Sequence, residues 1–193
     1  PLKSEAPKGA KWIIMHKSEY SSITKEDKAI LSQCDEIWTP SFFSRKAIID
    51  SGVDFNKVQV VPIGINPDIF TPFGEKFYLN TNKKLKFLFV GPTNNRKGFD
   101  ILLETYTKLF NQEDDVCLVI KENINTNLSE TTNAKLLIND KKLQFNTPEI
   151  IYIDNKLSQS EMASLYRACD IIVSPYRSIS MGIALLEAMA CGL

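Results

Sequence analysis

Short apolar segments alternate with helix-like segments along almost the whole chain, and this alternation constrains the fold more than any other feature. Continuous apolar runs separated by helices are typical of parallel strands that are covered on both faces. The sequence therefore predicts an α/β fold, with a parallel sheet and helices on both of its faces. We expect strands at residues 11–15, 36–39, 57–62, 85–90, 116–121, 149–153 and 170–174, and helices at 24–33, 42–50, 99–111, 158–169 and 182–191.

Proline, glycine and polar residues gather in the stretch after residue 62, which includes Pro67 and Pro72. Such a composition is typical of a linker between domains. We therefore predict three parts: residues 1–62 belong to a first α/β domain, residues 63–84 form an interdomain linker, and residues 85–193 belong to a second domain. A polar, asparagine-rich stretch inside the second domain predicts a loop with a mobile helix.

The composition excludes several classes of protein. Lysine and arginine number 23 and aspartate and glutamate also number 23, so the net charge is zero, whereas proteins that bind the nucleic-acid backbone carry a positive excess. No apolar run is long enough to cross a membrane. The four cysteines are widely spaced and form no cluster with the single histidine, which argues against a metal site. This usage predicts buried thiols in a reducing, cytoplasmic compartment.

Three predicted strand-to-helix loops carry polar side chains, and ligands of open parallel sheets bind at this carboxyl edge. In residues 91–98, the first glycine and Lys97 could hold a phosphate group, with a solvated turn as the alternative. Glu187 is the only charged residue of the last predicted helix, so it either meets ligand hydroxyls or amides, or pairs with a neighbouring arginine. The third loop, residues 154–156, could contribute to a base pocket.

Five segments of the sequence form a recognisable set: residues 35–41 (DEIWTPS), 61–70 (VPIGINPDIF), 90–100 (VGPTNNRKGFD), 165–170 (LYRACD) and 186–193 (LEAMACGL). Together they resemble the retaining glycosyltransferases of family 4, which have two facing Rossmann-like domains, the GT-B architecture. They follow the family's order and span nearly the whole chain. The resemblance implies that the chain holds the end of the N-terminal, acceptor-side domain and most of the Rossmann-like, nucleotide-sugar-binding domain.

The resemblance implies a site for a nucleoside diphosphate sugar, UDP- or GDP-linked, on the second domain. Lys97 would bind the donor diphosphate together with the amides that begin the last helix, and Glu187 would bind the ribose hydroxyls. The implied residues are Gly91, Arg96, Lys97 and Gly182 for the diphosphate, and Ile183 and Glu187 for the ribose and the sugar.

Catalytic candidates follow the first predicted strand. The resemblance places His16 like the family's first-domain histidine near the sugar and the acceptor, and Glu19 is an alternative counterpart to a glutamate of some relatives. A purely structural role for His16 stays open.

Two positions depart from the family pattern. Pro92 follows the phosphate-loop glycine where an arginine is usual, so Arg96 is the substitute. Ile179 stands eight positions before Glu187, where the family has a glutamate that contacts the transferred sugar. Loss of such a charged contact costs about 1.5–3 kcal/mol, which puts donor preference or rate in question but not nucleotide binding.

The implied reaction transfers a glycosyl group from a nucleoside diphosphate sugar to an unknown acceptor, with retention of the anomeric configuration. Cations and a helix N-terminus would stabilise the charge on the leaving diphosphate, and no metal or resident cofactor is implied. One alternative is a degenerate nucleotide-sugar-binding module without catalysis, which Ile179 and Pro92 favour. Another is a nicotinamide enzyme, although no Gly-x-Gly-x-x-Gly follows any predicted strand.

The ends of the sequence predict a piece of a longer protein, because it opens on Pro1 and stops at Leu193 inside the last family motif. We expect such a fragment to lack transfer activity of its own. The residues identify neither the sugar nor the acceptor. They predict a cytoplasmic protein. Peripheral membrane attachment stays open, although no basic amphipathic helix is evident to support it.

Overall fold

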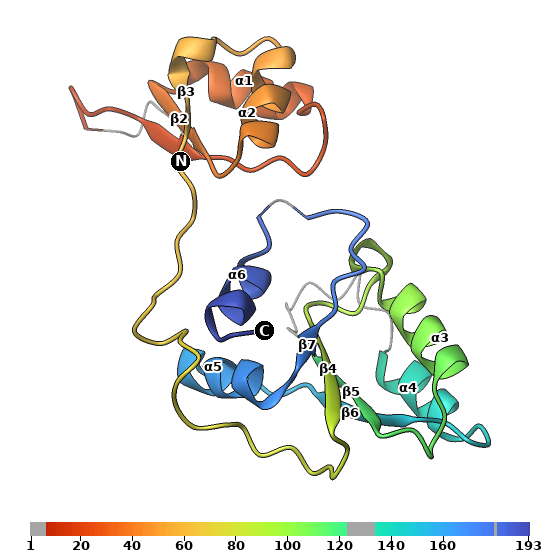
Figure 1. Cartoon of the computed structure of the whole chain (residues 1–193). Helices are drawn as coiled ribbons and strands as arrows, with labels where there is room; N and C mark the ends of the chain where they lie inside the picture. The colour runs from red at the N-terminus through yellow and green to blue at the C-terminus, as the bar shows by residue number, and fades with distance from the viewer. Residues whose placement is uncertain (1–6, 123–133, 180) are drawn as a thin grey trace. The chain divides into compact units, whose positions relative to one another are not determined.

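The computed structural model of the chain describes residues 7–122, 134–179 and 181–193. It divides into two compact units (Figure 1). The first consists of Pro1–Gly64 with Ile179–Met181, and the second of Ile65–Ser178 with Gly182–Leu193. Residues 65–84, which are most of the predicted linker 63–84, group with the second unit, and their side chains Phe70 and Leu79 belong to its buried core.

The first unit is a parallel three-stranded sheet in the order β1-β2-β3, with two α-helices packed against it. Side-chain hydroxyls fix where these helices begin: Thr24 caps α1, and Ser41 caps α2 by accepting from the Ser44 amide at 3.2 Å. A core that includes Ile37, Ile48 and Val58 lies between the sheet and the helices. The elements are β1 (Ile13–Met15), α1 (Lys25–Gln33), β2 (Glu36–Thr39), α2 (Phe42–Asp50), the 3₁₀-helix η2 (Phe55–Lys57) and β3 (Val58–Val60).

The second unit is a parallel four-stranded sheet in the order β6-β5-β4-β7, covered on both faces. Figure 1 shows α5 and α6 on one side of these strands and α3 and α4 on the other. Side chains of β5 alternate between the two cores: Cys117 and Val119 pack toward α5 and α6, and Leu118 and Ile120 pack toward α3 and α4. The elements are β4 (Leu85–Val90), η3 (Asn95–Lys97), α3 (Phe99–Leu109), β5 (Val116–Lys121), α4 (Ala134–Lys142), β6 (Glu149–Ile153), α5 (Gln159–Ala168), β7 (Ile171–Ile172) and α6 (Ile183–Ala190).

The order of the strands changes direction beside β4. The chain adds β5 and then β6 on one side of β4, and afterwards places β7 on its other side. The loops that leave β4 and β7 therefore diverge at the carboxyl edge of the sheet. In open parallel sheets, such a switch point is where ligands bind.

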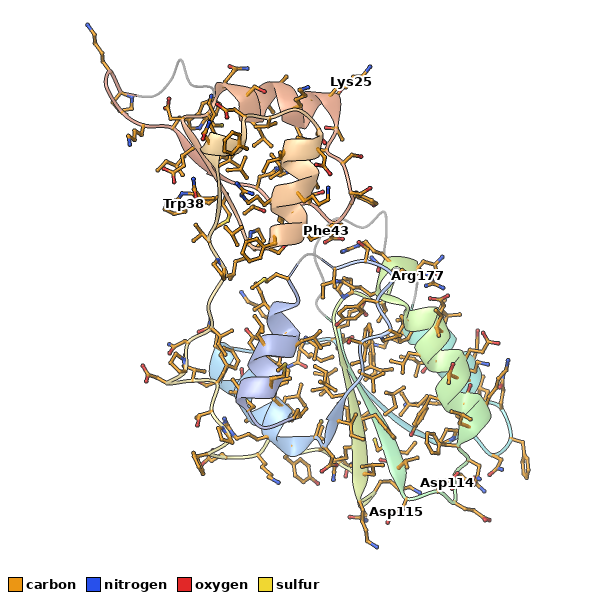
Figure 2. The ribbon with its side chains drawn as sticks, turned by 45° about the horizontal axis from the view of Figure 1, so that its top comes forward. Lys25, Trp38, Phe43, Asp114, Asp115 and Arg177 are labelled. Carbon is orange, nitrogen blue, oxygen red and sulfur yellow. The ribbon has the colours of Figure 1, made fainter. Side chains whose placement is uncertain are left out.

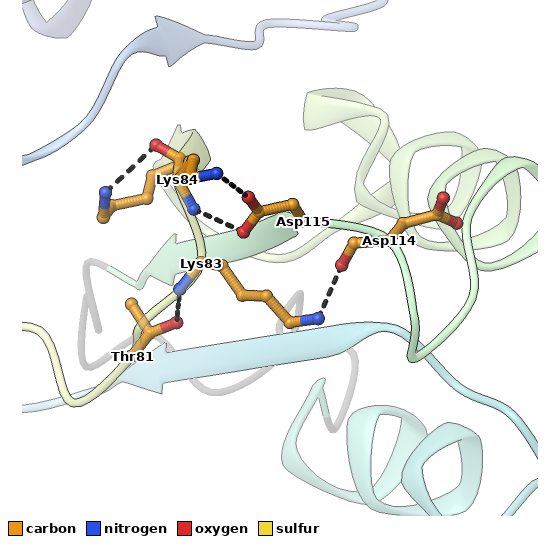
Figure 3. A network of polar contacts seen from close by, with 6 residues as sticks. Thr81, Lys83, Lys84, Asp114 and Asp115 are labelled. Carbon is orange, nitrogen blue, oxygen red and sulfur yellow. Dashed lines mark hydrogen bonds and ion pairs between the residues drawn. The ribbon is translucent and has the colours of Figure 1, made fainter.

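The amino edge of the same sheet is held by lysines that precede β4 (Figure 3). The Lys83 Nζ donates to the carbonyl oxygens of Gln112 and Asp114 at 2.8 and 2.6 Å. The Lys84 amide donates to the Asp115 carboxylate at 2.8 Å, and its Nζ lies 3.3 Å from the same side chain. These contacts fasten the entry of β4 to the entry of β5, and Figure 2 shows Asp114 and Asp115 at the end of the strands opposite to Arg177.

The structure confirms the predicted α/β class, with parallel strands and helices on both faces of the larger sheet. β7 is shorter than predicted, although the Val173 amide still donates to the Leu88 carbonyl at 2.8 Å. The predicted loop with a mobile helix lies partly outside the described residues, and its described part holds α4.

All four cysteines are buried, as expected from their apolar surroundings, and none of them is in a disulfide. Burial raises the pKa of Cys117 and of Cys169 to about 12, so both thiols stay protonated at neutral pH.

Candidate functional site

A cavity of about 780 Å³ opens at the carboxyl edge of the larger sheet, and all of its lining belongs to the second unit. Its lining includes the last residues of β4 and β5, the loop after β6, and side chains of α5 and α6. It therefore lies at the strand-order switch point. The lining residues are Val90, Lys121, Glu122, Asp154, Asn155, Lys156, Leu157, Met162, Tyr166, Ile183, Ala184 and Glu187.

Glu187 enters the cavity from α6 and is held by a tyrosine of α5. The Tyr166 hydroxyl donates to Glu187 Oε2 at 2.8 Å, and no described residue donates a hydrogen bond to Oε1. Burial raises the pKa of Glu187, and the bond from Tyr166 partly offsets this effect. Of the two predicted alternatives, pairing with an arginine is not what the structure has, since the partner is a tyrosine. Glu187 thus lines the cavity with one carboxylate oxygen that accepts no hydrogen bond from a described residue and can accept one from a ligand.

Two charged residues at the end of β5 are almost fully buried beside the same cavity. Lys121 is 2% exposed and Glu122 is 5% exposed. The Lys121 Nζ donates to the Glu122 carbonyl oxygen at 2.5 Å. Burial lowers the pKa of Lys121, and the nearby carboxylates of Glu122 and Asp154 counteract that shift. Such residues are rarely buried without a partner or a function.

The Glu122 carboxylate joins three strand ends. The Thr93 hydroxyl, in the loop after β4, donates to Glu122 Oε1 at 2.6 Å, and the Tyr152 hydroxyl of β6 donates to Oε2. Burial and the bond to this carboxylate raise the pKa of Tyr152, which therefore remains a donor at neutral pH. Glu122 consequently fixes the start of the 91–98 loop against β5 and β6.

The loops that follow β4 and β7 are fastened to each other. The guanidinium of Arg177 contacts both carboxylate oxygens of Asp100 at 2.8 and 2.9 Å and the Asn95 carbonyl at 2.5 Å. Figure 2 shows Arg177 beside the beginning of α3. The Arg177 amide also donates to the Arg96 carbonyl at 3.0 Å. The two loops therefore act as one assembly at the switch point.

Lys97 lies within this loop assembly, over an aromatic ring. Its Nζ is 4.3 Å from the centroid of the Tyr176 ring, within the range of a cation–π interaction. The Tyr176 hydroxyl in turn donates to the Val90 carbonyl at 2.7 Å, where β4 ends at the cavity. Lys97 is thus next to the cavity but is not part of its lining.

Among the predicted donor-site residues, Ile183 and Glu187 line the cavity, and residues 154–156 of the third loop do so as well. Gly91, Arg96, Lys97 and Gly182 lie in the adjoining loops, outside the lining. Gly182 caps α6 with a left-handed backbone (φ +71°, ψ 49°), which glycine adopts without strain. Their roles remain predictions.

The two catalytic candidates lie on the first unit, in the loop after β1. The His16 amide donates to the Trp38 carbonyl at 2.8 Å, which continues the pairing of β1 with β2. Ser18 secures the rest of the loop: its amide donates to Ser44 Oγ at 3.3 Å, and Ser44 Oγ donates back to the Ser18 carbonyl at 3.0 Å. His16 and Glu19 therefore sit at the carboxyl edge of the smaller sheet, and their catalytic roles remain predictions.

The sequence prediction missed three polar residues of the lining: Lys121, Glu122 and Tyr166. Lys121 and Glu122 had a detectable signal, because two charges directly follow an apolar strand at the edge where ligands bind. Tyr166 had none, since a tyrosine in an amphipathic helix is most often part of the core.

Within the described ranges, no group of three or more histidine, cysteine, aspartate or glutamate side chains is arranged to hold a metal ion. No helix in the same ranges is long and apolar enough to span a bilayer.

Comparison with known families matches residues 74–193, more than half of the chain, to the family described as "Glycosyl transferases group 1". A similar protein is D-inositol 3-phosphate glycosyltransferase 2 of Catenulispora acidiphila, which is 29% identical over 151 residues, covering 73% of this chain and 34% of that protein. D-inositol 3-phosphate glycosyltransferase of Xylanimonas cellulosilytica is 26% identical over 152 residues, with the same coverage. The chain spans about a third of the length of these curated relatives.

Among solved structures, the chain resembles Anabaena Alr3699/HepE in complex with UDP and glucose. The TM-score is 0.68 at 14% identity, and the match covers 93% of this chain and 50% of that one. The crystal structure of TarM matches 95% of this chain and 35% of that one, with a TM-score of 0.64 and 12% identity. These similarities support the fold, which in these neighbours is that of GT-B glycosyltransferases.

Proposed function

The chain belongs to the group 1 glycosyl transferases, and from this premise we propose that its second unit binds a nucleoside diphosphate sugar for retaining transfer of the sugar to an acceptor. The donor is a substrate, and the proposal includes no resident cofactor or metal. The whole protein would act in the cytoplasm. The chain given would contribute the donor site to that activity, without transferring the sugar alone.

The observation that carries the proposal is the position of Glu187 in the cavity at the strand-order switch point. Tyr166 holds one carboxylate oxygen, and the other is oriented by the same contact. A carboxylate with one fixed and one available oxygen is suited to accept hydrogen bonds from the two adjacent hydroxyls of a ribose. The raised pKa of Glu187 reflects the cost of burying this charge, which ligand hydroxyls would offset.

We assign the diphosphate to the loop assembly beside the cavity. Lys97 and Arg96 supply positive charge there, Gly91 allows close approach of the backbone, and Gly182 precedes the N-terminus of α6. Positive charge and helix amides at this position would stabilise the leaving diphosphate. On the first unit, His16, or alternatively Glu19, would face the transferred sugar and the acceptor.

The names of similar proteins guide the choice of ligand for a test. One neighbour in fold was solved with UDP and glucose, and relatives in sequence are named as D-inositol 3-phosphate glycosyltransferases. We therefore propose UDP as the first nucleotide to test on this chain, with GDP as the comparison.

The test is calorimetric titration of the chain with UDP and with 2′,3′-dideoxy-UDP, for the parent and for Glu187→Gln. The parent should prefer UDP, because only UDP offers both ribose hydroxyls to the carboxylate. Removing the charge should weaken UDP binding by roughly 10- to 100-fold, the range of a charge-assisted hydrogen bond. The variant should bind the dideoxy nucleotide as the parent does.

A matched control is Glu104→Gln, which removes an exposed carboxylate of α3 that pairs with Lys108. It should leave both affinities unchanged. If the parent binds neither UDP nor GDP, the proposed donor site is wrong. If Glu187→Gln loses affinity for UDP and for its dideoxy analogue equally, the ribose assignment is wrong.

One residue favours a second candidate, a nucleotide-sugar-binding module without catalysis. Ile179 stands where the resemblance calls for a glutamate that contacts the sugar, and the residue is 38% exposed. The whole protein, assayed for transfer from UDP- and GDP-sugars, separates the two. Nucleotide-sugar binding without any turnover would favour the binding module, whereas turnover restricted to few donors would fit a transferase whose sugar contact has changed.

A further inference from the structure

The end of β5 places a buried ammonium group at the cavity, and nothing in the proposed function uses it. Lys121 is the last residue of β5 and pairs in register with Val90 of β4 on one side and with Ile153 of β6 on the other. It therefore stands in the middle of the last row of the sheet. Lys121 and its register partner Val90 both line the cavity.

The alternation of β5 determines the face of the sheet to which Lys121 belongs. Cys117 and Val119 pack in the core shared with α5 and α6, and Lys121 follows Val119 by two residues. In a strand, residues two apart share a face. The Lys121 side chain is consequently on the same face as Glu187 and Tyr166, which line the same cavity.

Burial of the Lys121 ammonium group costs free energy of folding. Lys121 is only 2% exposed, and moving an ammonium ion out of water costs several kcal/mol, which its contacts have to offset. Its neighbour Glu122 directs its carboxylate to the hydroxyls of Thr93 and Tyr152, while its carbonyl accepts from Lys121. The carboxylates of Glu122 and Asp154 favour the charged form of Lys121, so a cation is held at the cavity lining.

Lys121 and Lys156 are the lysines of the cavity lining, and Lys156 is exposed to solvent. The other described lining charges are the carboxylates of Glu122, Asp154 and Glu187. An anionic ligand placed among these carboxylates needs a cation inside the cavity, and Lys97 lies outside its lining over Tyr176.

We infer that Lys121 is a second phosphate-binding cation of the donor site, which contacts the diphosphate from the floor of the cavity while Lys97 contacts it from the loop assembly. The inference rests on the proposed function. It assigns to Lys121 the anionic part of the donor, and leaves the ribose to Glu187. Two cations on opposite sides of the diphosphate would share the charge that develops on it as the sugar leaves.

The test compares ligands that differ only in their phosphates. Uridine and UDP are titrated into the parent chain, Lys121→Met and Lys121→Gln. Both substitutions remove the charge from a similar volume, and thermal unfolding verifies that each variant is folded. We expect UDP affinity to fall by roughly 10- to 100-fold in both variants, with uridine affinity unchanged. The preference for UDP over its dideoxy analogue should persist, because Glu187 is intact.

The matched control is Lys86→Met, which removes a lysine near the amino end of β4, at the opposite edge of the same sheet. It should bind UDP as the parent does. A measurement on the parent alone complements the variants: with ¹³C-labelled lysine, the pKa of the Lys121 ammonium should rise when UDP is added, because phosphate stabilises the charged form.

Several results would overturn the inference. Unchanged UDP affinity in a folded neutral variant, or no rise in the pKa of Lys121 on addition of UDP, would exclude contact with the diphosphate. Equal losses for uridine and UDP would assign Lys121 a structural role at the end of β5. Failure of the parent to bind UDP or GDP would instead refute the proposed function, and the inference with it. If the parent binds UDP and prefers it to the dideoxy analogue, the proposed function stands. A negative result at Lys121 then refutes the inference alone.

Discussion

At the scale of single residues, Gly98 shows how closely the two loops at the switch point approach each other. A Cβ at this position would lie 2.0 Å from the Pro175 carbonyl oxygen, and the backbone has φ +65°. Gly98→Ala therefore combines a clash with backbone strain, and we expect it to destabilise the second unit by at least about 2 kcal/mol. Denaturant unfolding followed by far-UV circular dichroism measures this change.

Gly91→Ala is the matched control for that prediction. Gly91 also has a positive φ, +148°, but a Cβ there would meet its nearest neighbour, the Tyr176 hydroxyl, at 3.8 Å. This variant reports backbone strain without the clash, so its loss of stability should be the smaller of the two. Equal losses would mean that the approach of Pro175 to Gly98 has no energetic consequence.

Residues of the candidate site were predictable where their chemistry conflicts with their surroundings. Glu187 is conspicuous as the one charge in an apolar helix, and it lies in the cavity. Its partner Tyr166 was not predictable, because the contact joins residues 21 apart on two helices whose packing no local pattern specifies. The position of Lys97 over Tyr176 likewise depends on how two distant loops fold together.

At the scale of elements, the start of α5 is a capping box that the sequence predicts. The Ser158 hydroxyl accepts from the Glu161 amide at 3.3 Å, and the Glu161 carboxylate accepts from the Ser158 amide at 2.7 Å. We expect Ser158→Ala to destabilise the second unit by about 1 kcal/mol, since it leaves a helix amide without its acceptor. Ser164→Ala, inside the same helix, should be close to neutral because alanine favours helix interiors.

The same capping box should make the loss of stability caused by Ser158→Ala depend on pH. Hydrogen bonds from Ser158 hold the pKa of Glu161 below its ordinary value. A carboxyl group with a depressed folded-state pKa contributes stability above its unfolded pKa and loses it as pH falls through the folded value. Ser158→Ala keeps the amide donor but removes the hydroxyl that donates to Glu161 Oε2 at 2.8 Å, so its penalty should be smaller in acid than at neutral pH. A larger penalty in acid would contradict a stabilising bond from the Ser158 hydroxyl to the Glu161 carboxylate.

The elements themselves were predictable because local signals agree with the fold. Ser41 and Ser158 mark helix starts, and the run 116–121 is apolar up to its final lysine, as expected of a central parallel strand. The extent of β7 was not predictable: it pairs with β4 over residues 171–172, and the turn that follows it must bring Pro175 against Gly98. Tertiary contacts decide that boundary.

At the scale of the whole molecule, the order of the strands in the larger sheet could not be predicted from the sequence. Alternation of strands and helices predicts a parallel sheet, yet it does not say on which side of β4 the strand β7 is placed. That choice creates the switch point and brings together the loops of residues 91–98 and 173–178, which are far apart in the chain. The cavity and its charges are consequences of topology, which explains why Glu187 was recognised singly and the cluster around it was not.

The two units have separate cores, and this division should be visible in unfolding. The core around Ile37 consists of first-unit residues, while the cores that contain Val119 and Leu118 consist of second-unit residues. Both tryptophans of the chain, Trp12 and Trp38, belong to the first unit. Tryptophan fluorescence therefore reports the first unit, whereas far-UV circular dichroism is dominated by the second, which holds four of the six α-helices described.

We predict that Leu118→Ala lowers the stability seen by circular dichroism by about 2–5 kcal/mol, because Leu118 is fully buried and the substitution leaves a cavity. The fluorescence transition should stay where it is in the parent. Ile37 is equally buried in the first unit. Ile37→Ala should lower the stability seen by tryptophan fluorescence and leave the circular-dichroism transition of the second unit where it is in the parent. If either substitution moved both transitions together, the two units would unfold as one cooperative body, and a nucleotide bound to the second unit would then stabilise the first as well.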